Sequence, residues 1–259
     1  MQVLLFTALA GICGMGLGGF VSVVILKRPS GRMICWLLMF AAGVMTSIVC
    51  FGLVPEAISL SGIVVSIIGL ILGVVTIMIL NRLVDRVTDA RAGDQGVHLT
   101  HEELYHEGSV IRSRSMMKSG IIMLTAIALH NIPEGMAIGA GGSHDFQLGL
   151  MLAIMIAMHN IPEGMAVAAP LIAGGLGRGR VIFLTSLSGA PTLIGGVIGM
   201  LIGSISDMAV AMALSAAGGA MLYVVFGEMI PQSIIMTRSR AATIVALFGL
   251  IVGLIITQL

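Results

Sequence analysis

The stretch IALHNIPEGMAIGA, residues 127–140, recurs almost unchanged as IAMHNIPEGMAVAA, residues 156–169. The first copy places His130 four residues before Glu134, and the second copy repeats this spacing. Side chains four residues apart lie one above the other on the same face of an α-helix. We therefore expect two successive helices, each presenting an imidazole and a carboxylate on one face.

Both copies also carry a proline between these polar residues, Pro133 in the first and Pro162 in the second, where the pair is His159 and Glu163. Proline lacks an amide N–H, and inside a helix it frees the carbonyl oxygen four residues earlier. The pattern predicts two kinked helices whose histidines and glutamates can surround a cation.

The composition predicts that this chain works in a membrane. Hydrophobic residues make up 58% of its 259 residues and charged residues only 10%, whereas soluble domains carry about 25% charged residues. The net charge of +1 gives no support for nucleic-acid binding, which needs clustered basic residues. The cysteines at positions 13, 35 and 50 lie in apolar stretches, where we expect them to act as small packing residues.

Apolar runs of about 20 residues are long enough to cross a bilayer, and they recur along the chain. No basic residue precedes the first run, which indicates a retained helix rather than a cleaved signal peptide. We predict an all-α polytopic membrane protein forming one transporter domain over residues 1–259, with a polar cytoplasmic loop at 84–118. The eight expected spans are residues 3–26, 34–54, 63–83, 119–142, 147–171, 181–203, 208–230 and 241–258.

The basic residues set the expected orientation of these spans. All thirteen Lys and Arg residues fall on one side of the eight-span arrangement, and cytoplasmic loops are the ones that gather Lys and Arg. We therefore expect a multi-pass protein of the cell (inner) membrane with both termini outside the cytoplasm. Helices two and seven also share a short echo, FGLVPEAIS (51–59) and FGEMIPQSII (226–235). This echo suggests an inverted repeat of helices one to three and six to eight around the two motif helices.

Two acidic residues fall near the middle of the expected membrane, Glu134 and Glu163, and Glu228 lies nearer the cytoplasmic end of helix seven. An ionisable residue in hydrocarbon is costly and usually faces a cavity, a partner or a permeating ion. No Lys or Arg lies at matching depth, so a bound cation is the simplest compensation. Imidazole and carboxylate together suit zinc and related divalent transition metals, whereas calcium and magnesium prefer oxygen ligands.

Three further residues have two interpretations each. Met45 on helix two offers a soft thioether ligand, although with 20 methionines in the chain ordinary packing is the simpler role. Asn131 and Asn160 follow the motif histidines by one position. They can serve a second, more oxygen-rich site that shares the glutamates, or they can bond to backbone groups opened by the prolines.

The chain resembles the ZIP (Zrt/Irt-like) family of divalent metal transporters, prokaryotic type. The resemblance is carried by the doubled HNIPEG, by AAGVM at residues 41–45, and by the AGGAMLYVV and EMIP segments of helix seven. The resemblance implies eight helices, external termini, a variable cytoplasmic loop after helix three and a homodimer. It implies a primary metal site of Met45, His130, Glu134, His159 and Glu163. It implies a secondary site of Asn131, Glu134, Asn160 and Glu163.

Two features of the chain bear on this resemblance. Family members often place another glutamate on helix six, where this sequence has Thr192; we therefore expect one strong site and a weak or absent second one. The family often has a His-rich loop after helix three, and here the loop carries His98, His101 and His106. They are candidates for gathering metal or, alternatively, belong to a solvated loop. Glu228 matches a polar position on helix seven in the family, and we assign it to the exit pathway.

The function we expect is transport of Zn²⁺, or of Fe²⁺, Mn²⁺ or Cd²⁺, toward the cytoplasm, with the ion as substrate and no catalytic cofactor. An intramembrane zinc hydrolase and a metal-sensing receptor are the alternatives. The hydrolase lacks an HExxH sequence, and every candidate group fits a ligand role. The partners implied are the metal ion and the lipid bilayer.

Overall fold

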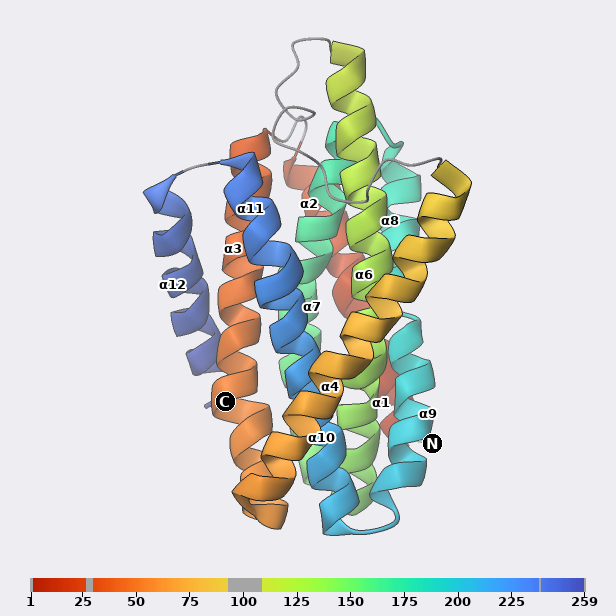
Figure 1. The fold of residues 1–259 in the computed structure, drawn as a ribbon, viewed down its shortest axis with the longest axis vertical. Helices are drawn as coiled ribbons and strands as arrows, with labels where there is room; N and C mark the ends of the chain where they lie inside the picture. Colours follow the sequence, from red (N-terminus) through yellow and green to blue (C-terminus); the bar gives the residue numbers. More distant parts are fainter. Residues whose placement is uncertain (1, 27–29, 93–108, 238, 259) are drawn as a thin grey trace.

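The computed structural model describes residues 2–26, 30–92, 109–237 and 239–258. The regular structure within these ranges is entirely helical, as the sequence predicts (Figure 1). Within these ranges six helices are long and apolar enough to cross a membrane: Gln2–Ile25, Gly31–Leu80, Met116–His144, Phe146–Ala173, Arg178–Gly203 and Asp207–Ile234. A further helix, Arg240–Ile256, is apolar but shorter than these six.

The second of these six segments contains a sharp break. It contains α3 (Gly31–Ile48), a π-helical turn η2 (Val49–Leu53) and the first part of α4 (Val54–Ala92). Gly62 within it has φ 78° and ψ 169°, outside the helical region, a conformation that glycine adopts without steric cost. Figure 1 shows α3 and α4 running in opposite directions, joined at the lower end of the molecule. The apolar stretch is therefore folded back on itself.

The region around the expected loop 84–118 is more helical than its polar composition suggested. Helix α4 continues to Ala92, and α6 (Ser109–His144) begins ten residues before the apolar run at 119. Helices thus extend past their apolar segments at both sides of this connection. The candidate ligands His98, His101 and His106 lie outside the described residues.

The remaining helices carry the motif and its neighbours. The first helix comprises α1 (Gln2–Ala8), η1 (Leu9–Cys13) and α2 (Gly14–Ile25). The second motif copy lies on α7 (Phe146–Ala173), while the first lies on α6. The chain continues as α8 (Arg178–Ser188), α9 (Pro191–Gly203), α10 (Asp207–Val224), η3 (Val225–Met229), α11 (Ile230–Met236) and α12 (Arg240–Ile256).

The two segments of the sequence echo share an irregular backbone turn. In η2 the amide of Val54 bonds to the carbonyl of Val49, and in η3 the amide of Ile230 bonds to that of Val225. In each case the next residue is a proline. A proline ring clashes with the carbonyl four residues earlier, and a wider π turn accommodates the displaced carbonyl. The echo therefore produces the same local structure twice.

Helix packing surrounds the two motif helices. Helices α6 and α7 contact each other, α9 packs along α6, and α2 packs along α7. Glycines allow these close approaches: a Cβ atom on Gly18 would overlap the carbonyl oxygen of Ile161, and one on Gly195 would overlap that of Ile132. On the other side of the molecule α12 packs on α3, and α10 packs on α4.

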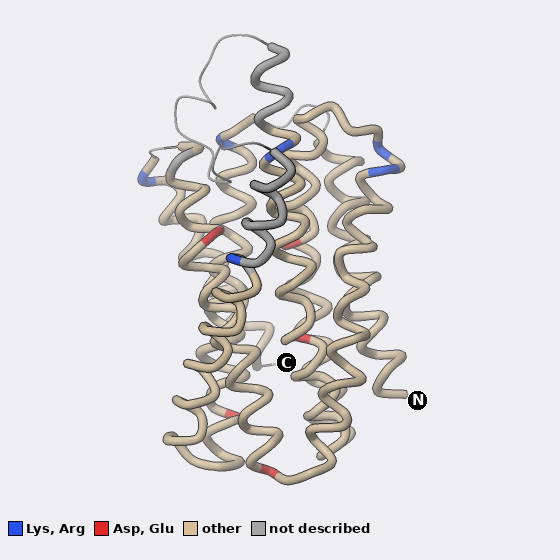
Figure 2. The backbone as a smooth tube through the Cα atoms, turned by 45° about the vertical axis from the view of Figure 1, so that its right-hand side comes forward, with Lys and Arg blue, Asp and Glu red and all other residues tan. Residues whose placement is uncertain are grey.

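Charges are distributed unequally along the molecule. Figure 2 shows the Lys and Arg residues of the described ranges toward one end, and none at the opposite end, where acidic residues occur. Much of the surface between the ends is apolar, with exposed side chains such as Leu17, Ile67 and Ile244. This distribution fits a helical bundle with its apolar sides in lipid.

Candidate metal centre

The motif residues lie inside the bundle. His130, Asn131 and Glu134 on α6 have no exposed surface, and neither do their counterparts on α7, namely His159, Asn160 and Glu163. Both helices continue through their internal prolines, so the i, i+4 spacing does place each His and Glu on the same helical face. The sequence predicts this much of the site.

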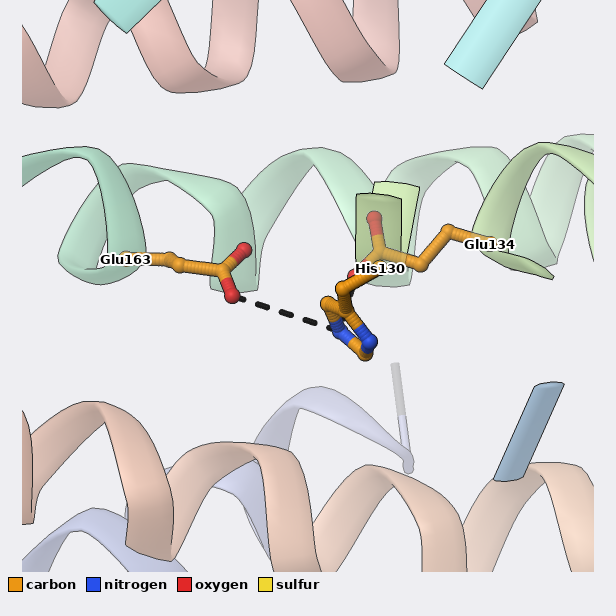
Figure 3. Close-up of side chains that lie close together, drawn as sticks. All are labelled: His130, Glu134 and Glu163. Atoms are coloured by element: carbon orange, nitrogen blue, oxygen red, sulfur yellow. Dashed lines mark ion pairs between the residues drawn. The ribbon is translucent and has the colours of Figure 1, made fainter. Parts of the chain in front are cut away.

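The carboxylate of Glu134 lies between two imidazoles. Its Oε1 atom is 2.9 Å from Nε2 of His130 and 2.8 Å from Nε2 of His159. Glu163 approaches from α7, with its Oε1 atom 4.0 Å from Nε2 of His130 (Figure 3). One ligand atom each from His130, Glu134 and Glu163 lies within 4.8 Å of the others. These separations allow imidazole nitrogen and carboxylate oxygen to bind one ion.

A backbone contact defines the tautomer of His159. Its Nδ1 atom is 3.2 Å from the carbonyl oxygen of Met155, and since a carbonyl only accepts, Nδ1 carries the hydrogen. This fixes the ring and directs Nε2 at Glu134. An imidazole lone pair and a carboxylate oxygen 2.8 Å apart repel each other unless a proton or a cation lies between them. The arrangement of a histidine oriented through its second nitrogen is typical of metal ligands.

Glu163 has no hydrogen-bond partner for either carboxylate oxygen among the described residues, and Oε2 of Glu134 also lacks one. The ion pairs of both glutamates in these ranges are with histidine rather than with Lys or Arg. Burying a carboxylate without a hydrogen bond or an opposite charge is costly. A divalent cation would compensate both carboxylates together.

The two motif asparagines each bond to a backbone carbonyl of a neighbouring helix. Nδ2 of Asn131 donates to the carbonyl of Ser188, the last residue of α8, over 2.7 Å. Nδ2 of Asn160 donates to the carbonyl of Ala10, within η1, over 3.0 Å. The Oδ1 atoms of both are buried without a partner in the described part of the chain. Each asparagine thus has an anchored amide nitrogen and an oxygen still available to a cation.

The other predicted residues lie on separate helices. Met45 is completely buried on α3, which packs against α7. Thr192 is buried at the start of α9 beside Gly11, and its hydroxyl has no hydrogen-bond partner within the described ranges. Glu228 is half-buried in η3. Glu228 does not belong to the group formed by His130, Glu134 and Glu163 in the described part of the chain.

Sequence reasoning missed the backbone groups that hold the site. The carbonyls of Ala10, Met155 and Ser188 each accept from a motif side chain. A carbonyl group carries no residue signature, so the only available signal is a helix irregularity. The Gly189-Ala190-Pro191 break after α8 is such a signal, since proline begins helices readily.

Together, the fold and the site define an all-helical, multi-pass membrane protein with a buried His/Glu group suited to a divalent metal. The family model for the ZIP zinc transporter matches residues 2–259. The chain therefore belongs to the ZIP family, as its doubled motif indicates. Membership of a transporter family decides against the hydrolase alternative.

Several curated relatives are similar to this chain. The zinc transporter ZupT of Escherichia fergusonii is 32% identical over 232 residues, which cover 88% of this chain and 85% of its own. ZupT of Shigella flexneri matches to the same extent. The zinc transporter GufA of Myxococcus xanthus is 38% identical over 152 residues, or 58% of this chain and 59% of its own.

Proposed function

We propose that this protein is a secondary transporter that moves Zn²⁺, or a related divalent transition metal, across the membrane toward the cytoplasm. The observation that carries the proposal is the placement of Glu134 between the imidazoles of His130 and His159. Beside them lies the carboxylate of Glu163, which has no hydrogen-bond partner among the described residues. Family membership and the names of the ZupT and GufA relatives support zinc as the substrate. Fe²⁺, Mn²⁺ and Cd²⁺ suit the same ligands.

The proposed ligands follow from the burial and chemistry of the site. His130, Glu134, His159 and Glu163 form the primary site, and Met45 supplies a thioether from α3. The Oδ1 atoms of Asn131 and Asn160, which have no hydrogen-bond partner among the described residues, support a second, adjacent position that shares the glutamates. Because a neutral threonine stands at position 192, this second position binds the ion more weakly. Glu228 belongs to the exit pathway in this scheme.

The proposed membrane arrangement has eight spans, with both termini outside, and helices one to three related to helices six to eight by an inverted repeat. In this count α3 and α4 form helices two and three, separated at Gly62. In this repeat α2 corresponds to α9, α3 to α10, α4 to α12 and α6 to α7. The contact of α3 with α12 then corresponds to that of α10 with α4, and the contact of α2 with α7 corresponds to that of α9 with α6. The equivalent approaches of Gly18 to Ile161 and Gly195 to Ile132 support the same relation, as do the matching π turns.

Transport in this scheme exchanges water for protein ligands and back again. The ion loses water as it enters the buried site, where imidazole and carboxylate replace the hydration shell. A rigid-body shift of the motif helices against the flanking units then opens the site toward the cytoplasm. Glycine contacts along the seams of α6 with α9 and of α7 with α2 support such a shift, because close backbone contacts there involve few side chains that would have to repack.

Zinc binding should weaken as the pH falls. Protons and zinc compete for the same imidazole nitrogens and carboxylate oxygens, and ligands must be deprotonated to bind the metal. Each proton that has to leave lowers the apparent affinity by up to about tenfold per pH unit. Isothermal titration calorimetry with Zn²⁺, in steps of about half a pH unit from about pH 5.5 to about pH 7.5, measures this change in apparent affinity. An affinity that is constant over this range would contradict the proposed ligand set.

Uptake of radiolabelled Zn²⁺ into proteoliposomes tests transport itself. Accumulation inside the vesicles, reversed by an ionophore and absent from protein-free liposomes, is the expected result. A receptor that binds zinc without moving it would label only the protein, at no more than the binding stoichiometry. Competition by unlabelled Fe²⁺, Mn²⁺ and Cd²⁺ in the same assay ranks these ions as substrates. A separate crosslinking experiment in the liposomes tests the expected homodimer.

A further inference from the structure

A second His–carboxylate pair lies at the end of α6, away from the central site. His144 is the last residue of α6, and Asp207 is the first residue of α10. Nδ1 of His144 and Oδ1 of Asp207 are 3.4 Å apart. Unlike the central ligands, these side chains are partly exposed, 31% for His144 and 66% for Asp207. They are accessible to ions from outside the bundle.

The separation of the two atoms matches the geometry of a shared zinc ion. Ligand bonds of about 2.0–2.1 Å in tetrahedral zinc sites place neighbouring ligand atoms about 3.3–3.4 Å apart. Hydrogen bonds from nitrogen to oxygen are shorter, with a most common length of about 2.9–3.0 Å. His144 and Asp207 can therefore occupy one edge of a zinc tetrahedron without moving. Their exposure leaves the other two positions for water.

The surrounding charge favours a cation. Figure 2 shows acidic residues and no Lys or Arg at the lower end of the described molecule. Asp145, which directly follows His144, is held in place because its Oδ1 accepts from the amide of Leu148 at the start of α7. Acidic groups gathered without basic ones raise the local concentration of cations.

The pair is also well placed to supply the central site. His144 lies on the same helix as Glu134, ten residues further along, so the two levels are about 15 Å apart at a rise of about 1.5 Å per residue. In the proposed orientation this end of α6 faces outward. The ligand chemistry is the same at both levels, imidazole with carboxylate.

We propose that His144 and Asp207 form a zinc-capture site at the outer end of the bundle. The site holds a partly hydrated Zn²⁺ ion through Nδ1 of His144 and one carboxylate oxygen of Asp207, with water as the remaining ligands. Binding at this site stands independently of transport. The delivery of the ion to Glu134 and its partners rests on the transport function proposed above.

Zinc titration of the full-length protein tests the binding. In a Glu134→Gln/Glu163→Gln background, which weakens the central site, adding His144→Ala or Asp207→Ala should weaken one remaining zinc-binding event at least about tenfold. The same two substitutions in the otherwise unchanged protein should lower the zinc stoichiometry by one. Gln147→Ala, at an exposed position of the same end, is the matched control and should change nothing. Titration curves that are identical with and without His144 and Asp207 would overturn the site.

Uptake kinetics test the capture role. His144→Ala should raise the half-saturating zinc concentration more than it lowers the maximal rate, because capture limits uptake only when zinc is scarce. The exchanged variant His144→Asp/Asp207→His keeps both ligand types and should recover most of the lost uptake at low zinc. A half-saturating concentration equal to that of the Gln147→Ala control would overturn the capture role. If the unsubstituted protein moves no zinc, the transport proposal fails, while the titrations still decide whether the site exists.

Discussion

Replacement of Glu134 by alanine is expected to lower zinc uptake into proteoliposomes by at least about a hundredfold. Glu134 is the only one of the four primary ligands that approaches both imidazoles, at 2.9 Å and 2.8 Å. Its loss removes a ligand and also leaves His130 and His159 without the anion that separates them. Two neighbouring imidazoles would then have to accept the charge of a divalent ion with only Glu163 nearby. Initial rates of radiolabelled Zn²⁺ uptake measure the loss.

The protein itself should remain folded after this change. Removing a buried carboxylate also removes its desolvation cost, and the two histidines can remain neutral, so no uncompensated charge is left inside the bundle. Thermal unfolding and gel-filtration profiles near those of the unsubstituted protein are therefore expected. Glu56→Ala provides the control, since Glu56 is half-buried in the first turn of α4 and lies outside the His/Glu cluster. Uptake by Glu134→Ala at the rate of Glu56→Ala would refute the assignment of the site.

The sequence predicts that the histidines and glutamates of the two motif copies lie close together, but not how they pair. Two copies of HNIPEG suggest two equivalent pairs, His130 with Glu134 and His159 with Glu163. In the structure His130 is close to its own glutamate, yet Nε2 of His159 faces Glu134 on the other helix. The helical spacing fixes which face each residue occupies. The relative height and rotation of α6 and α7 decide the partners across that face, and these depend on packing throughout the bundle.

In the fold, too, the features that depend on the local sequence are predicted, and those that depend on contacts with other parts of the chain are not. Apolar runs predict the helices and their approximate ends, because each run must be long enough to cross lipid. The additional helical turns up to Ala92 and from Ser109 have no such apolar signal. The hydrogen bonds that anchor Asn131 and Asn160 could not be predicted from the sequence either, because their acceptors are the backbone carbonyls of Ser188 and Ala10. Those carbonyls are available only because α8 ends and the first helix widens at these positions.

A large effect on stability is expected at the seam between α6 and α9. A Cβ atom on Gly195 would overlap the carbonyl oxygen of Ile132 and lie 3.0 Å from the amide nitrogen of Met136. These are backbone atoms of α6, which cannot rotate away as a side chain would. Overpacking usually costs about 1–3 kcal/mol and sometimes more, so Gly195→Ala should fall at the upper end of that range. Thermal unfolding in detergent or nanodiscs measures the loss.

The same substitution at Gly179 separates this steric effect from the general effect of alanine in a helix. Gly179 lies in α8, where an added Cβ meets nothing within 4 Å, and alanine there should be neutral or stabilising by up to about 1 kcal/mol. Gly195→Ala should also reduce zinc affinity, because Ile132 lies midway between His130 and Glu134, and displacing its backbone displaces both ligands. Equal unfolding temperatures for the two variants would mean that α9 does not fix the position of α6. If instead Gly195→Ala loses stability and zinc affinity together while Gly179→Ala loses neither, the close contact of two helix backbones determines the geometry of the metal site.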